Sequence, residues 1–328
     1  MIITRTPFRV TLGGGGTDLP SYYSKYGGFI FSAAIDKYMF VDVNRPVIDD
    51  LIRLKYSETE TVESLGEIKH EVAREILRMM DIKKGIEISS VADISAGTGV
   101  GSSSCYAVGL LNALHALKRD HVSLQTLAEE DFKIESEILK RPIGKQDPYM
   151  AAFGGLTVLE IEKGGDVKVR RARVSYETAD DLNKNMLLFF TGKTRSADVI
   201  LSEQSNAVKE DKKEVVESMH YIKEIGHKIL EAVEGNNLKA VGRLFDAHWQ
   251  YKKKISDKMS NPEFDKIYDI AKKNGALGGK ITGAGGGGFF TFYVDENHGK
   301  FRETMKTLGL REMRYRFDFS GSKVLVDF

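Results

Sequence analysis

Residues 94–117 read ISAGTGVGSSSCYAVGLLNALHAL, a glycine-rich stretch that runs directly into a candidate helix. Glycines alternate at Gly97, Gly99 and Gly101, and three serines follow at 102–104. The first amides of a helix lack internal partners, and glycine lets the backbone approach a ligand closely. The stretch therefore predicts a phosphate-binding loop at a helix start. Apolar residues then recur at the spacing of a helix face, at Ala107, Leu110, Leu111, Leu114 and Leu117.

The loop matches neither of two common nucleotide-binding motifs fully. A Walker A loop ends in Gly-Lys-Ser/Thr, but Gly101 is followed by serine, and no lysine lies between Asp93 and Lys118. A dinucleotide-dependent oxidoreductase would need an acidic ribose ligand after a strand, about twenty residues further on. Asp120 is near that distance but lies at the end of the expected helix. A glycine turn before a buried helix, without any ligand, is the structural alternative.

The composition is that of a globular protein large enough for two domains. The chain has 328 residues, of which 41% are hydrophobic and 29% charged, and its net charge is +1. This balance argues against nucleic acid or an anionic membrane surface as a partner. The single cysteine, Cys105, cannot form an internal disulfide, which fits a reducing cytoplasm. We expect it to be a small buried residue rather than a catalytic thiol.

The N-terminal residues lack the apolar region of a signal peptide, and no apolar run is long enough to span a bilayer. We therefore expect a cytoplasmic protein, monomeric or homodimeric, whose partner is a small molecule.

The apolar pattern divides the chain into regions 1–175 and 176–328, with a boundary in the polar run 176–185. The first region has a helical pattern at 65–80 and another after Ser123, a typical N-cap residue. The second region alternates strands and helices as a ferredoxin-like domain does. Strands of the first region are expected at 2–12, 29–35, 38–43, 51–56, 85–91, 156–161 and 167–174.

Three glycine loops, at 13–16, 97–101 and 283–288, each follow a strand-like run. No local fold requires glycine clusters at such distances along the chain. We infer that backbone from all three loops surrounds one large, charged ligand set. A nucleotide phosphate together with a second polar substrate fits this pattern.

The three loops lie in motifs that resemble those of the GHMP kinase family, which includes galactokinase and mevalonate kinase. The motifs are TPFRVTLGGGGTD at 6–18, SAGTGVGSSS at 95–104 and KITGAGGGGF at 280–289, in the family's order. The resemblance implies an α/β (α+β) fold of two domains, the N-terminal one ribosomal-protein-S5-domain-2-like and the C-terminal one ferredoxin-like. The second motif departs from the family pattern at Ser95, Val100 and Ser104, where proline, leucine and alanine are usual.

Two segments narrow the resemblance to the branch of D-glycero-D-manno-heptose 7-phosphate kinases: the GGGTD sequence of the first motif and GKQDPYMAAFGG at 144–155. This branch implies transfer of phosphate from ATP to the anomeric C1 hydroxyl, giving the 1,7-bisphosphate. A fucokinase-like enzyme acting on an unphosphorylated sugar is one alternative. A non-catalytic relative that senses nucleotide or sugar is another.

The resemblance assigns catalysis to Asp147 and Arg9. The aspartate would orient the attacking hydroxyl, and the cation would stabilise charge on the transferred phosphate. From the residues alone, Asp147-Pro148 also fits a helix N-cap and Arg9 a strand surface.

ATP should bring Mg²⁺, for which the resemblance implies Ser103 and Glu135, with Glu137 as the rival carboxylate. An exposed helix face is the simpler interpretation of both glutamates. The ATP phosphates are assigned to Ser95, Gly97, Gly99, Gly101, Ser102, Ser103 and Ser104.

Asp18 resembles the family's sugar-binding aspartate, although it could also cap a helix that begins at Leu19-Pro20. Lys193 and Arg195 are candidates to hold a phosphate on the acceptor, or else solvated loop charges. The remaining expected substrate-binding residues are Gly15, Gly16, Thr17, Gly283 and Gly285.

Overall fold

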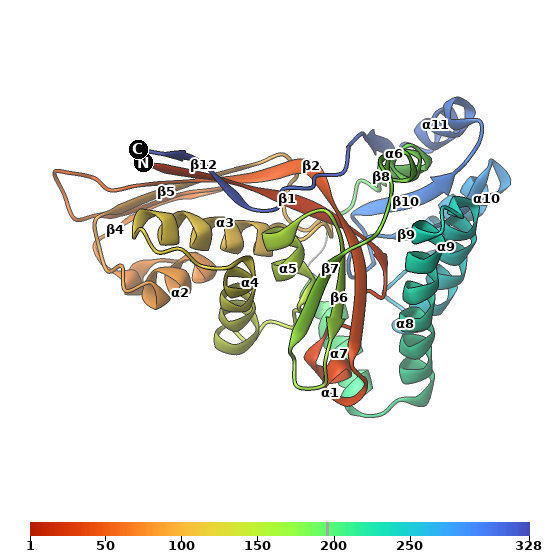
Figure 1. Cartoon of the computed structure of the whole chain (residues 1–328), viewed down its shortest axis with the longest axis horizontal. Helices are drawn as coiled ribbons and strands as arrows, with labels where there is room; N and C mark the ends of the chain where they lie inside the picture. The colour runs from red at the N-terminus through yellow and green to blue at the C-terminus, as the bar shows by residue number, and fades with distance from the viewer. Residues whose placement is uncertain (195–196) are drawn as a thin grey trace.

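The computed structural model describes residues 1–194 and 197–328, and these build two sheets with their helices (Figure 1). The first sheet has the strand order β12-β1-β2-β5-β3-β4, with β6 paired to β2 and β7 to β6. Its pairs are antiparallel except for β3 with β5. The strands are β1 (Ile2–Gly13), β2 (Gly28–Asn44), β3 (Ile52–Lys55), β4 (Thr59–Val62), β5 (Ile86–Ala92), β6 (Leu156–Ile161), β7 (Val167–Arg171) and β12 (Lys323–Asp327).

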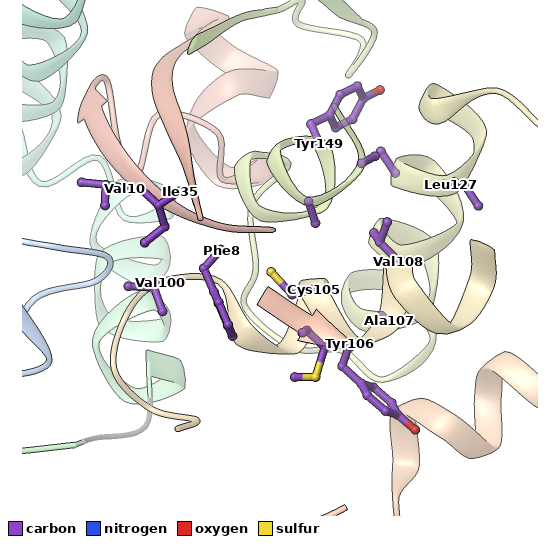
Figure 2. Packing of buried hydrophobic residues seen from close by; sticks show 14 of the residues in the cluster. Phe8, Val10, Ile35, Val100, Cys105, Tyr106, Ala107, Val108, Leu127 and Tyr149 are labelled. Atoms are coloured by element: carbon purple, nitrogen blue, oxygen red, sulfur yellow. The ribbon is translucent and has the colours of Figure 1, made fainter. Parts of the chain in front are cut away.

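Helix α3 packs across β1 and β2 and is the central helix of this part. Its apolar side chains are buried all round, because α4 and α5 cover the side that the sheet leaves open. Figure 2 shows Phe8 of β1 between Val100 and Cys105, which stand on either side of the α3 start. The helices here are α1 (Pro20–Tyr26), α2 (Glu71–Met79), α3 (Ser102–Leu117), α4 (Leu124–Phe132) and α5 (Gln146–Phe153), with the 3-10 turn η1 (Leu65–Glu67) and the π-helical turn η2 (Lys133–Ile138).

Cys105 is buried, and its thiol donates to the Pro7 carbonyl at 3.2 Å. Burial raises the pKa of the thiol well above its ordinary value. The residue is thus an inert packing group, as expected from the sequence.

The second sheet has the order β11-β8-β10-β9, and aromatic side chains fill the space between it and its helices. Trp249, Phe264, Phe290 and Phe292 are fully buried there. The elements are α6 (Tyr176–Asn185), β8 (Met186–Phe190), α7 (Ala197–Lys209), α8 (Lys213–Glu234), α9 (Leu238–Lys253), α10 (Pro262–Lys273), β9 (Ala276–Ile281), β10 (Phe289–Val294), α11 (His298–Thr307) and β11 (Arg311–Met313).

Two local predictions were wrong. The strands expected at 29–35 and 38–43 form the single strand β2, which stays paired to β1 through an irregularity between the Pro7–Tyr38 and Phe8–Ile35 pairs. The helix expected at 65–80 begins at Glu71, after the separate turn η1.

The polar run at the expected boundary forms helix α6. The Ser175 side chain caps it by accepting from the Thr178 amide. The other cap expected from the sequence, Ser123 before α4, is confirmed, since its hydroxyl accepts from the Thr126 amide.

The last strand, β12, pairs with β1 in the first sheet rather than with the second sheet that precedes it. In the described residues, none of the helices has the length and apolar character that a membrane crossing requires.

Candidate active site

The three glycine loops meet around one cavity of about 860 Å³. Its walls come from both sheets, from the start of α3 and α5, and from α7 and α9. The convergence predicted from the sequence is therefore confirmed. The predicted site residues that line the cavity are Arg9, Gly15, Gly16, Asp18, Ser95, Gly97, Gly99, Gly101, Ser102, Ser103, Ser104, Glu135, Asp147 and Gly283.

The second and third glycine loops are in direct contact. Gly99 has a φ of 79°, and a Cβ there would lie 2.7 Å from the Thr282 carbonyl oxygen. Gly288 has a φ of 86°, and a Cβ there would overlap the Thr98 carbonyl oxygen. Glycine is thus required at both positions by backbone conformation and by space.

Arg9 and Asp147 form a two-pronged ion pair in the cavity wall. The Arg9 Nε donates to Oδ1 of Asp147 at 2.6 Å, and the second guanidinium nitrogen donates to Oδ2 at 2.8 Å. The remaining nitrogen donates to the Gly99 carbonyl at 2.6 Å, which ties the pair to the glycine loop. Arg9 is only 5% exposed, so it is not a surface arginine of the strand.

Asp147 is the second residue of α5 and does not cap it. The helix start is held by Asp18, whose Oδ2 accepts from the Gln146 amide at 3.0 Å. Burial, and secondarily the charge of Asp147, raise the pKa of Asp18, while bonds from backbone amides including those of Gln146 and Gly16 oppose the shift. Asp18 does not cap α1 either, since Leu19 is the N-cap residue there.

Ser103 and Glu135 meet at the α3 start. The Ser103 hydroxyl donates to the Glu135 carboxylate at 2.7 Å, and Arg141 donates to the same oxygen at 3.0 Å. Glu135 is 1% exposed and lines the cavity, whereas the rival Glu137 is exposed and lies outside the lining. The geometry therefore favours Glu135 over Glu137.

The Ser103 and Glu135 oxygens suit Mg²⁺, which prefers hard oxygen ligands. Across residues 1–194 and 197–328 there is no cluster of three or more His, Cys, Asp or Glu side chains that could hold a metal ion. The two residues thus fit an ion whose other ligands are phosphate oxygens and water.

Three other predicted residues that the structure describes do not line the cavity. The Thr17 hydroxyl donates to the carbonyls of Gly14 and Phe29, so it holds the first loop together. Gly285 packs against Met259. The Lys193 ammonium pairs with Glu263 of α10, and the Lys193 carbonyl accepts from the Gly288 amide. Arg195 lies outside the described residues.

Several cavity-lining residues were missed. Gln146 bridges Thr11 and Asp147, with its amide nitrogen 2.7 Å and 3.2 Å from their oxygens. Its position next to Asp147 in the sequence could have identified Gln146 as a site residue. The other missed polar residues are Arg141, His248, Lys252 and Lys280, of which Lys280 stands inside the third motif.

Aromatic rings line another part of the cavity. Tyr56, His70 and Tyr106 contribute to its wall. The His70 ring lies 4.8 Å from each of the two tyrosine rings, measured between centroids. These rings offer apolar faces on which a planar base could stack.

Comparison with known proteins agrees with this geometry. The model of the GHMP kinases N terminal domain matches residues 67–155, and that of the GHMP kinases C terminal domain matches residues 229–302. The chain is similar to D-glycero-alpha-D-manno-heptose 7-phosphate kinase of Campylobacter jejuni, with 32% identity over 98% of this chain and 97% of that protein.

Solved structures share the fold over nearly the whole chain. A putative sugar kinase from Campylobacter jejuni is 29% identical, with a TM-score of 0.77 over 98% of this chain and 97% of that one. A D-glycero-D-manno-heptose 1-phosphate kinase from Bacteroides thetaiotaomicron is 24% identical, with a TM-score of 0.80 over 100% of both chains. The two-domain α/β fold expected from the three motifs is thereby confirmed.

Proposed function

Because the chain belongs to the GHMP kinase family, we propose that it phosphorylates the anomeric C1 hydroxyl of D-glycero-D-manno-heptose 7-phosphate with ATP. The coarser assignment, a phosphotransferase of the sugar-kinase class, follows from the family and from the heptose kinase relative. The product would be the 1,7-bisphosphate. The observation that carries the proposal is the Arg9–Asp147 pair, bonded to the glycine loop in the same cavity as the α3 start.

In this reaction the C1 oxygen forms a bond to the γ-phosphorus while the bond to the bridging oxygen of ADP breaks. Asp147 orients the hydroxyl and accepts its proton. Arg9 holds that carboxylate in place and neutralises charge on the transferred group. The amides at the α3 start bind the triphosphate, since helix N-termini favour anions.

Mg²⁺ would be held by Ser103 and Glu135 and would neutralise charge on the β- and γ-phosphates. Asp18, buried beside the first glycine loop, would exchange hydrogen bonds with a sugar hydroxyl. The enzyme would act in the cytoplasm, as a monomer or homodimer.

The test is ATP consumption with a panel of sugars and sugar phosphates, followed by phosphorus NMR of the product. The proposal expects the highest kcat/KM with D-glycero-D-manno-heptose 7-phosphate and a new signal for phosphate on C1. A preference for an unphosphorylated sugar such as fucose would replace the substrate assignment. Binding without turnover of any sugar would point to a non-catalytic relative.

A further inference from the structure

We propose that Lys280 and His248, with Lys252 beside them, form the binding site for the phosphate group of the acceptor. The inference rests on the proposed function. It identifies the part of the cavity that would distinguish a phosphorylated sugar from an unphosphorylated one.

Lys280 reaches from the second sheet to the first. It lies on β9, is 2% exposed, and its ammonium donates to the Leu12 carbonyl of β1 at 2.6 Å. Arg9 precedes Leu12 by three residues on the same strand, which corresponds to about 10 Å along the strand. This span is comparable with a sugar whose reacting hydroxyl is near Arg9 and whose phosphate is at its far end.

His248 supplies an unpaired polar group beside Lys280. It lies on α9, is 1% exposed and lines the cavity. Among the described residues, neither ring nitrogen has a hydrogen-bond partner. A buried polar group without a partner is unfavourable, so the site is better satisfied when a ligand supplies one.

This cluster, made up of Lys280, His248 and Lys252, brings three nitrogen-bearing side chains together, and a bound anion would favour their protonated forms. Burial, followed by the charge of Lys252, lowers the pKa of Lys280 well below its ordinary value. Burial, followed by the charges of both lysines, also lowers the pKa of His248. Lys252 donates to the carbonyls of Ile281 and Gly283, at 3.0 Å and 2.5 Å, which fixes it at the third glycine loop.

In the described part of the chain, no carboxylate forms an ion pair with Lys280, whose contacts are the Leu12 carbonyl and the Phe245 ring at 4.9 Å. A sugar hydroxyl needs no such concentration of buried amino and imidazole groups, whereas a phosphate supplies several acceptor oxygens and a negative charge that favours the protonated forms of these groups. The proposed function assigns the nucleotide phosphates to the α3 start, which leaves this cluster for a second phosphate.

The test compares Lys280→Met with the wild type on D-glycero-D-manno-heptose 7-phosphate and on the same heptose without phosphate. Loss of charged hydrogen bonds should raise KM for the sugar phosphate about 10- to 100-fold. The KM for ATP, kcat, and kcat/KM for the unphosphorylated heptose should stay near wild-type values. Lys228→Met is the matched control, because Lys228 is exposed on α8 and pairs with Glu224.

His248→Phe is the second variant, since it removes both ring nitrogens at similar volume and leaves the lysines in place. It should also raise KM for the sugar phosphate selectively, and it carries the test if Lys280→Met does not fold. Lys280→Arg, which keeps the charge, should recover part of the affinity.

The outcomes separate the two proposals. If the wild-type enzyme uses the sugar phosphate but the variants raise KM equally for the phosphorylated and unphosphorylated heptose, the proposed function stands. The cluster would then have a structural role. A wild-type enzyme that accepts no phosphorylated sugar would overturn both. A preference for a different sugar phosphate would change the substrate assignment only, and the same variants would then be measured with that compound.

Discussion

Asp147 is the residue to which we assign the attacking hydroxyl in the proposed reaction. Asp147→Asn keeps the shape of the side chain but removes its charge and its ability to accept a proton. We expect kcat to fall by roughly two orders of magnitude or more, with a smaller change in KM. Steady-state kinetics, with circular dichroism to verify folding, measure this.

A matched control for that variant is Asp166→Asn, at an exposed turn between β6 and β7, which should leave kcat unchanged. Wild-type turnover by Asp147→Asn would exclude the carboxylate from the chemical step.

His115 of α3 is nearly buried and bonds two carboxylates, with Nδ1 3.0 Å from Asp120 and Nε2 2.9 Å from Glu130. The bond to Glu130 is the largest cause of its raised pKa, although burial opposes the shift. A raised folded-state pKa contributes stability that is fully present below the ordinary value of 6.5 and is lost as pH rises through the folded-state value.

His115→Gln should therefore lower the midpoint of thermal unfolding more at about pH 6 than at about pH 9. Unfolding followed by circular dichroism at both values provides the comparison. An equal loss at both would mean that the ring acts through packing rather than through its charge.

The sequence pointed to Arg9 and Asp147, the proposed catalytic residues, because both stand in or beside recognisable motifs, and the structure brings the two side chains together. The sequence missed His248, which comes from a helix with an ordinary apolar pattern and meets Lys280 only when α9 packs on β9. It also proposed Lys193 as a candidate for binding an acceptor phosphate, and in the structure the Lys193 ammonium forms an ion pair with Glu263. The spacing of residues along the sequence does not reveal ion pairs between residues that are far apart in the chain.

At the scale of elements, contact between the second and third glycine loops restricts the residue type most strongly, because it leaves no room for a side chain. Gly288→Ala would place a methyl group against the Thr98 carbonyl at a φ unfavourable for alanine. We expect a loss of about 1–3 kcal/mol in the free energy of unfolding and a higher KM for ATP. Denaturant titration and steady-state kinetics measure the two effects.

Gly299→Ala in α11 is the control, since a Cβ there would meet nothing within 4 Å and its φ is not positive. Alanine should be neutral or stabilising by up to about 1 kcal/mol at this helical position. Similar losses in both variants would contradict the requirement for glycine at the loop contact.

Strongly periodic elements were predictable, and elements that depend on partners were less so. The apolar faces of α3 and α8 fix their type, and the short strands β6 and β8 were located within a few residues. Helix α6 has few apolar residues, so its helical state was not evident from the sequence. The continuity of β2 depends on β1 running beside it, which tolerates the irregularity at Asp36-Lys37.

At the scale of the whole molecule, the strands of the first sheet do not form one continuous part of the chain. The pairing of Ile2 with Asp327 brings β12 back to the first sheet, so the second sheet lies between β7 and β12 in sequence. We propose a domain division into 1–175 and 176–328. This division assigns β12 to the second domain by sequence, although β12 pairs with β1 in the first sheet. The sequence shows a final strand but no signal for a partner so distant along the chain.

The touching carbonyls and glycines at Thr98, Gly99, Thr282 and Gly288 have a thermodynamic consequence. One loop borders the proposed triphosphate site and the other the proposed acceptor site, and neither has room to shift independently. We therefore expect that a ligand which shifts one loop also shifts the other, and linkage then requires the two substrates to change each other's affinity by the same factor. The order in which the two substrates bind can change the binding rates, but it does not change the factor by which each alters the affinity of the other.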